Sequence, residues 1–284
     1  MQMNVIGKPY TFGPVKYDLF ARTYIMGVLN VTPDSFSDGG MYYDLEKAVT
    51  RGLEMVEEGA DFIDVGGESS RPGTEPISTD EELRRVIPVI ERLAKSVDIP
   101  ISIDTYKSAV AVHALDAGAA IVNDISGLHF DGELGGVVAK RNASIILMHI
   151  KGTPRTMQQN PTYENVIEEI CSYLQEGIRS AQEAGIVQII VDPGIGFGKT
   201  LGHNLKVLRK LGEFRRFGVP VMVGPSRKSF IGAILDLPVG ERVEGTVAAL
   251  AVAVMNGANV VRVHDVKEMK RAAKVVDACM QSES

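Results

Sequence analysis

The sequence has few cysteines and no long run of apolar residues. Only two of its 284 residues are cysteines, Cys171 and Cys279, and each lies in a separate helix-like stretch. Such cysteines exclude a disulfide framework or a cysteine metal site and fit a reducing compartment. The longest apolar run, 247–255, is far shorter than the roughly 20 residues that a membrane helix needs. Because the N-terminus also lacks an export signal, we expect a soluble cytoplasmic protein.

Charge of one sign is also missing from the sequence. The 30 Lys and Arg residues face 36 Asp and Glu residues, a formal net charge of −6, and no block of like charges occurs. This balance argues against nucleic acid or an anionic membrane as a partner. Any anion that the protein binds must therefore be held by a few cations in defined positions.

A glycine junction recurs along the chain. Gly59, Gly118, Gly185 and Gly257 each end a helix-like segment and precede a short β-branched run. Glycine readily adopts the left-handed conformation that closes a helix, so the repetition indicates a repeated βα unit. The eight strands that we expect are 24–29, 62–65, 101–103, 120–122, 144–148, 189–191, 221–223 and 260–263.

Eight evenly spaced βα units predict a closed (β/α)8 TIM barrel. We expect a single domain over 1–284, with a hairpin in 1–20 that covers the lower end of a barrel formed by 24–280. Thr79 and Glu82 have the spacing of a capping box at the start of the second helix. A doubly wound open sheet is the alternative, but its Gly-x-Gly-x-x-Gly turn does not follow the first strand.

Polar or glycine residues end or follow every expected strand. In a closed barrel all eight carboxyl ends surround one mouth, so these residues should converge on a single site. Each one alone can also be interpreted as a helix cap, whereas the whole set favours an active site. The residues are Asn30, Asp64, Asp104, Asn123, Asp124, His149, Asp192, Gly224, His264 and Asp265.

Cations at the same end predict an anionic, phosphate-bearing substrate. Arg71 lies in a glycine-rich segment after the second strand, Lys228 follows the seventh, and Arg262 belongs to the eighth. The loops after strands seven and eight form the usual phosphate site of such barrels, and arginine can bind phosphate with two parallel hydrogen bonds. Arg227 also follows the seventh strand, but two adjacent cations cannot easily face one site, so a solvated surface position is its alternative.

The neutral and acidic residues of the mouth indicate what the anion is attached to. Asp104, Asn123 and Asp192 offer acceptors for the donor edge of a nitrogen heterocycle. A buried carboxylate also stabilises positive charge, which matters if a phosphate leaving group departs before the nucleophile arrives.

Two further segments are rich in turn-forming residues. Segment 192–199 resembles a nucleotide-binding loop, but Pro193 stands where a P-loop needs glycine. We interpret it as a loop whose backbone approaches its neighbours closely, with Phe197 as an aromatic wall. Segment 31–43 is a candidate lid, in which Phe36 would cover a ring or anchor a hinge.

The same residues carry a resemblance to a known family. Over essentially its full length the chain resembles the dihydropteroate synthases, which are pterin-binding TIM barrels. The most specific segments are MGVLNVTPDSFSDGG at 26–40 and GPSRKSF at 224–230. The other matching segments are 64–73, 102–105, 123–124, 147–149, 192–199 and 261–265. The resemblance implies a transferase of folate biosynthesis, a sulfonamide target, that condenses 6-hydroxymethyl-7,8-dihydropterin pyrophosphate with p-aminobenzoate to 7,8-dihydropteroate and pyrophosphate.

The resemblance also implies a role for each site residue. The pterin would be bound by Asp104, Asn123, Met148, Asp192, Gly224 and Lys228. The pyrophosphate would be bound by Asn30, Arg71, Arg262 and His264, with Asn30 also contacting Mg²⁺. The p-aminobenzoate would be framed by Phe36, Ser70, Pro72, Phe197, Lys228 and Ser229. The C–O bond would break first, and the residues expected to act in catalysis are Asn30, Asp104, Lys228 and Arg262.

One departure and two alternatives accompany the resemblance. Ser70 stands where the family usually has threonine, so its contact with the p-aminobenzoate ring would be looser. A pterin-binding methyltransferase domain shares the barrel, but it has no reason to carry Arg71, Arg262 and His264. A non-catalytic homologue is the second alternative, and the intact Asp104 argues against it. The apolar segment 247–255 is broader than one helix stripe requires, and there we expect a homodimer contact.

Overall fold

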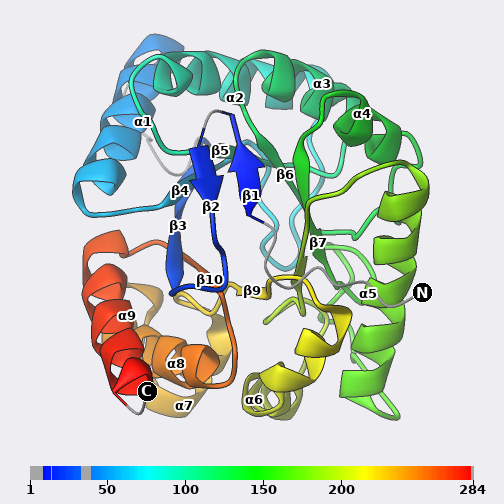
Figure 1. Ribbon diagram of the computed structural model, residues 1–284, viewed down its shortest axis with the longest axis vertical. Helices are drawn as coiled ribbons and strands as arrows, with labels where there is room; N and C mark the ends of the chain where they lie inside the picture. The colour runs from blue at the N-terminus through cyan, green and yellow to red at the C-terminus, as the bar shows by residue number, and fades with distance from the viewer. Residues whose placement is uncertain (1–8, 14, 33–39, 283–284) are drawn as a thin grey trace.

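A ring of eight parallel strands forms the centre of the molecule (Figure 1). The computed structural model describes residues 9–13, 15–32 and 40–282, with only the backbone described over 40–44. The strands run in the order β8-β7-β6-β5-β4-β3-β10-β9. A parallel bridge from Val191 of β8 to Val221, beside β9, closes the ring. The predicted closed barrel is therefore confirmed, and the open sheet is excluded.

All eight predicted strands are present, with small shifts at their ends. The fourth begins at Ile121, one residue later than expected, although the Ala120 backbone already bonds to the Ile101 carbonyl at 2.8 Å. The bounds are β3 (Tyr24–Asn30), β4 (Phe62–Gly66), β5 (Ile101–Asp104), β6 (Ile121–Asp124), β7 (Ser144–Met148), β8 (Ile189–Asp192), β9 (Met222–Val223) and β10 (Val260–Val263).

Helices surround the ring of strands (Figure 1). They are α1 (Gly40–Glu57), α2 (Thr79–Ala94), α3 (Ser108–Asp116), α4 (Leu134–Lys140), α5 (Val166–Glu183), α6 (Leu201–Arg209), α7 (Ser229–Leu235), α8 (Val243–Met255) and α9 (Val266–Gln281). The expected capping box of α2 is wrong by one residue. Ser78 is the N-cap and accepts a hydrogen bond from the Glu81 N–H at 3.2 Å. Glu82 accepts instead from Lys107 Nζ at 2.7 Å.

Alternate residues of each strand face the helices and the barrel interior. In β3, Ile25 and Leu29 pack in the cluster that joins the strands to the helices, while Tyr24 and Met26 pack inside the ring. Side chains alternate along a strand, so the inward series of β3 continues to Asn30. The same alternation takes β4 from Phe62 to Asp64, β5 from Ser102 to Asp104, and β10 from Val260 to Arg262.

A hairpin closes the amino end of the barrel, as expected from the sequence. It pairs β1 (Tyr10–Phe12) with β2 (Val15–Tyr17), and Figure 1 shows it over the middle of the ring. The Phe12 ring lies 5.4 Å from that of Phe62, edge to face. The Tyr10 hydroxyl donates to the Ile189 carbonyl at 2.8 Å. The buried apolar cluster here consists of Tyr10, Phe12, Leu19, Tyr24, Met26, Phe62, Ile121, Ile146, Ile190, Met222 and Val260.

The cysteines are also arranged as expected. Cys171 is buried in α5, Cys279 is exposed on α9, and both are free thiols. Among the helices that the structure describes, none is long and apolar enough to cross a membrane.

Candidate active site

Arg262 occupies the centre of the barrel mouth. Its Nε donates to Asp64 Oδ2 at 2.6 Å, and its Nη2 donates to Asp104 Oδ2 at 2.7 Å. Asn123 Nδ2 donates to the same Asp64 oxygen at 2.9 Å. Four residues from β4, β5, β6 and β10 therefore form one connected network, which burial makes stronger than it would be in water. Three of them, Asp104, Asn123 and Arg262, are residues to which the sequence assigned substrate contacts.

Asp64 is the network residue to which sequence reasoning assigned no role beyond its place at a strand end. Its side chain is fully buried, and Oδ1 has no hydrogen-bond partner among the described residues. Asn123 Oδ1 is likewise buried and unpartnered. Buried acceptors are normally satisfied, so the pair is suited to a ligand that brings N–H donors. The signal was available, since alternation from the core residue Phe62 points Asp64 into the barrel.

Burial raises the pKa values of two of the acidic groups at the mouth, Asp104 and Asp192. The pKa of Asp104 rises to about 7, against the opposing effect of the Arg262 charge. The pKa of Asp192 rises to about 6, opposed by the Gly194 N–H, which donates to Asp192 Oδ1 at 2.7 Å. Each carboxyl group can therefore change protonation state near neutral pH.

Lys228 and Phe197 lie together beside these carboxyl groups. Lys228 Nζ stands 4.1 Å from the centre of the Phe197 ring, a cation–π contact. Burial and the Arg262 charge together lower the pKa of Lys228 to about 8, against the opposing effect of Asp192 and Asp104. A side chain at position 196 would begin 3.0 Å from Lys228 Cδ, so Gly196 leaves room for the lysine. The aromatic wall predicted at Phe197 thus carries a cation on its face.

His264 and Asn30 lie close to the network. The His264 Nδ1 lies 3.0 Å from Ser226 Oγ, and burial lowers the pKa of the imidazole to about 3, so the ring is neutral at pH 7. A Cβ built on Gly66 would lie 3.5 Å from Asp104 Oδ2 and 3.8 Å from Asn30 Oδ1. The Asn30 amide and the Asp104 carboxylate therefore border the same glycine.

The remaining predicted pterin residues also stand at strand ends. Met148, the last residue of β7, is buried beside Ile150 and Phe197. Gly224 follows β9. A Cβ atom at this position would lie 3.8 Å from Arg262 Cβ, an ordinary van der Waals distance, so Gly224 borders the network.

The glycine-rich loop after β4, which contains Arg71, lies at the surface of the mouth. Arg71 and Pro72 are exposed, and Ser70 is half-buried. The loop is anchored at its base, where Glu68 accepts hydrogen bonds from Lys107 Nζ at 2.7 Å and Tyr106 Oη at 2.9 Å. Ser229 is exposed at the first position of α7. Phe36 and most of the candidate lid lie outside the described residues.

Two other strand-end residues, Asp124 and Asp265, have hydrogen-bond partners within the protein. Asp124 accepts from the backbone N–H groups of Ser126 at 2.7 Å and Leu128 at 2.6 Å, so it shapes a turn. Asp265 accepts from Arg227 Nε at 3.0 Å. Arg227 is therefore paired with a carboxylate and is not a solvated surface cation, and the Asp265 side chain makes no cap hydrogen bond to α9.

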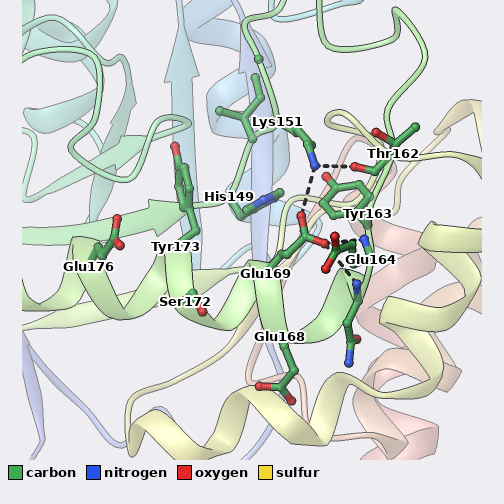
Figure 2. A pocket seen from close by; sticks show the side chains of 13 residues that line it. His149, Lys151, Thr162, Tyr163, Glu164, Glu168, Glu169, Ser172, Tyr173 and Glu176 are labelled. Atoms are coloured by element: carbon green, nitrogen blue, oxygen red, sulfur yellow. Dashed lines mark hydrogen bonds and ion pairs between the residues drawn. The ribbon is translucent and has the colours of Figure 1, made fainter.

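A separate hollow of about 1020 Å³ lies between the loop after β7 and helix α5 (Figure 2). Figure 2 shows His149 between Tyr163 and Tyr173, with Lys151 joined to Glu169 at 3.1 Å. The hollow is lined by His149, Ile150, Lys151, Gly152, Thr162, Tyr163, Glu164, Asn165, Glu168, Glu169, Ser172, Tyr173 and Glu176. None of the four residues of the Arg262 network is in its lining.

Comparison with known proteins decides the family. The model of the family described as pterin binding enzyme matches residues 26–264. A dihydropteroate synthase of Synechocystis is 50% identical over 273 residues, covering 95% of this chain and 94% of that protein. The chain belongs to the dihydropteroate synthase family of pterin-binding enzymes. The Bacillus subtilis synthase is 49% identical over 261 residues, covering 91% of this chain and 89% of that protein.

Solved structures of the family share the fold over nearly the whole chain. A Yersinia pestis dihydropteroate synthase in complex with a sulfonamide drug superposes with a TM-score of 0.91 at 42% identity, covering 97% of this chain and 100% of that one. The Xanthomonas albilineans synthase in complex with 7,8-dihydropteroate gives a TM-score of 0.87 at 39% identity, covering 96% and 99%.

Proposed function

We propose that this member of the family catalyses the condensation of 6-hydroxymethyl-7,8-dihydropterin pyrophosphate with p-aminobenzoate, forming 7,8-dihydropteroate and pyrophosphate. The observation that carries the proposal is the Arg262 network, in which buried carboxylates, an amide and a cation meet at the mouth of the barrel. It offers acceptors for a heterocycle and donors for an anion within one site.

The pterin would occupy the inner part of the mouth. Its N–H groups would donate to Asp64 Oδ1 and Asn123 Oδ1, the two buried acceptors that lack partners among the described residues. The carboxylates of Asp104 and Asp192 would accept further donors, and Met148 would pack against the ring. A site built from unpaired buried acceptors rejects ligands without matching donors.

The pyrophosphate would be held on the cationic side as the leaving group. Arg262 uses Nε and Nη2 on carboxylates, which leaves three of the five N–H donors of a guanidinium. His264 and Asn30 border the same region, and the exposed Arg71 would reach it from its loop. Electrostatic stabilisation by such groups acts on the negative charge that develops as the C–O bond breaks.

The Asn30 amide oxygen fits the proposed Mg²⁺. This ion prefers oxygen ligands and is often held by one or two protein groups together with substrate phosphates. The described residues contain no cluster of three or more His, Cys, Asp or Glu that could hold a metal ion. The ion would therefore bind mainly through the pyrophosphate, whose charge it would neutralise.

The chemical step follows from these positions. The C–O bond to the pterin methylene breaks with both electrons passing to the pyrophosphate, and the Asp104 carboxylate stabilises the cation left behind. The amine nitrogen of p-aminobenzoate then forms the new C–N bond and loses a proton to solvent. Phe197 and Lys228 would position that second substrate through its ring and its carboxylate, together with Ser70, Pro72 and Ser229.

The direct test supplies the substrates separately and together. With Mg²⁺ present, purified protein should release pyrophosphate in turnover amounts only when both pterin pyrophosphate and p-aminobenzoate are added. A sulfonamide should compete with p-aminobenzoate and not with the pterin pyrophosphate. Absence of dihydropteroate under these conditions would contradict the proposal and favour a non-catalytic homologue.

We also propose a homodimer, which is supported by exposed apolar side chains on adjacent helices. On α8, Val252 is 44% and Met255 is 68% exposed, and on α9 Val275 is 64% exposed. Apolar groups gathered in this way often mark an interface. A monomeric mass in solution would contradict it. The two free cysteines support a reducing compartment, for which we propose the cytoplasm.

A further inference from the structure

Lys199 is a buried lysine that the proposed reaction does not use. Its side chain is 2% exposed, and its Nζ lies 2.8 Å from the Gly194 carbonyl oxygen, 3.0 Å from that of Phe197 and 2.9 Å from His149 Nδ1. The amino group can donate to both carbonyls and either donate to His149 Nδ1 or accept from it, so these three partners satisfy it in either protonation state. The lysine is therefore engaged entirely by groups of the protein.

The turn that Lys199 holds has an unusual backbone. Gly194, Gly196 and Gly198 have φ values of 70°, 84° and 63°, in the region that favours glycine. A side chain at Gly194 would overlap the His149 carbonyl oxygen, and one at Gly198 would begin 2.6 Å from that of Lys151. This close approach explains the Gly-x-Gly-x-Gly spacing, and it confirms the prediction that the loop backbone lies against its neighbours.

The turn carries two residues of the proposed site. The Gly194 N–H orients the Asp192 carboxylate at 2.7 Å, and the Phe197 ring supports Lys228 Nζ at 4.1 Å. The Gly194 carbonyl also accepts from the Phe197 N–H at 3.1 Å, so it keeps a donor if Lys199 is removed. The Phe197 carbonyl has Lys199 as its only hydrogen-bond donor among the described residues. Loss of the lysine should therefore displace Phe197 more than Asp192.

His149 supports Lys199 from the outer side. Its ring is 4% exposed and lies 4.8 Å from the Tyr173 ring and 6.2 Å from the Tyr163 ring, as Figure 2 shows. The Tyr163 hydroxyl donates to the Gly198 carbonyl at 2.7 Å, a second tie between this wall and the turn. The imidazole is thus fixed by aromatic packing and presents Nδ1 to the lysine.

We propose that Lys199, supported by His149, is a positioning residue that sets the place of Phe197 and thereby the binding of the second substrate. The inference rests on the proposed function, because that function assigns Phe197 to p-aminobenzoate. It gives the glycine-rich turn a role in substrate selection without any contact between the lysine and a substrate.

The test compares Lys199→Met with Lys206→Met, which removes an exposed lysine from the adjoining helix α6. Lys199→Met should raise the KM for p-aminobenzoate by about tenfold, the size expected when a buried carbonyl is left without its hydrogen-bond donor. Calorimetric binding of bare 6-hydroxymethylpterin should weaken by at most about threefold, since Asp192 keeps the Gly194 N–H. Lys206→Met should change neither quantity.

A second variant covers the case in which Lys199→Met does not fold. His149→Leu removes one hydrogen-bond partner of Lys199 and leaves the two carbonyls, so it should raise the same KM by a smaller factor of about three. An unchanged KM in the variants that fold, or an equal loss of p-aminobenzoate and pterin binding, would overturn the proposal.

Hydrogen exchange separates failure of this inference from failure of the proposed function. The amides of 195–198 should exchange faster in Lys199→Met, or in His149→Leu if the former does not fold, than in Lys206→Met; equal exchange would overturn the positioning role. A wild-type protein that makes no dihydropteroate contradicts the proposed reaction instead, and the exchange result still decides whether the lysine fixes the turn.

Discussion

The two ends of the barrel are built from the same strands and differ completely in chemistry. At the amino end, inward residues such as Tyr24, Phe62 and Val260 pack with the hairpin in an apolar cluster. Two positions further along their strands, Met26 is still apolar but Asp64 and Arg262 form a buried ion pair at 2.6 Å. The side chains at both ends face the barrel interior because they alternate along the strands. The difference between the two ends therefore lies in the residue types alone.

This difference separates stability from function within one scaffold. An apolar layer that excludes water contributes to folding wherever it packs, whereas buried charges cost desolvation energy and are retained for what they bind. The amino end should therefore tolerate no loss of volume, and the carboxyl end should tolerate no loss of charge. A substitution at one end should leave the property of the other end unchanged.

The largest expected effect is on stability, at the amino end. Phe62→Ala removes a ring that is 1% exposed and contacts the rings of Phe12, Tyr17 and Tyr24. It should lower the free energy of unfolding by about 3–5 kcal/mol, the usual cost of such a cavity. Denaturant unfolding measures this. The exposed Phe20→Ala is the control, and kcat/KM of the folded fraction should be unchanged in both.

At the carboxyl end, Asp104→Asn should lower the activity and leave the stability nearly unchanged. The amide cannot stabilise a pterin-methyl cation, so kcat should fall by about 10²–10³-fold, as when one electrostatic group of an active site is lost. Arg262 keeps Asp64 as its partner, so the unfolding free energy should change little. Steady-state kinetics test this, with the exposed Asp116→Asn as control. A kcat within twofold of wild type would remove Asp104 from the mechanism.

The pH dependence of kcat/KM should report the carboxyl end alone. Asp104 and Asp192 have pKa values raised to about 7 and about 6, so they lose their charge as the pH falls through that range. Lys228, with a pKa lowered to about 8, loses its charge as the pH rises above that value. A bell-shaped profile with its maximum between these limbs is expected. A flat profile from pH 5 to 9, in roughly the range where these groups titrate, would contradict the assignment.

The smallest expected effect comes from the hairpin. Tyr10→Phe removes the buried hydrogen bond to the Ile189 carbonyl, which is 2.8 Å long. Thermal or denaturant unfolding should show a loss of about 1–2 kcal/mol, because the carbonyl is left unsatisfied. Tyr17→Phe is the matched control, since its hydroxyl has no described hydrogen bond. If Tyr10→Phe altered catalysis instead, the separation of the two ends would be incorrect.

The sequence predicted most of this arrangement, because barrel strands carry strong local signals. The β-branched runs, the closing glycines and the polar strand ends located all eight strands and most of the mouth. The inward position of Asp64 could also be predicted from the sequence, because side chains alternate along a strand and Phe62, two residues earlier, faces inward. The Lys199–His149 contact could not be predicted, because it joins residues 50 positions apart whose spacing carries no periodic signal. The pairing of Arg227 with Asp265 likewise depends on how two neighbouring loops fold.

The most direct test of the central claim is product formation by the wild type, Phe62→Ala and Asp104→Asn under identical conditions. Incorporation of labelled p-aminobenzoate into 7,8-dihydropteroate should be matched by an equal amount of pyrophosphate. Per folded molecule, it should be unchanged in Phe62→Ala and nearly abolished in Asp104→Asn. No labelled product from the wild type, or equal product from Asp104→Asn, would contradict the assignment of this chemistry to the carboxyl end.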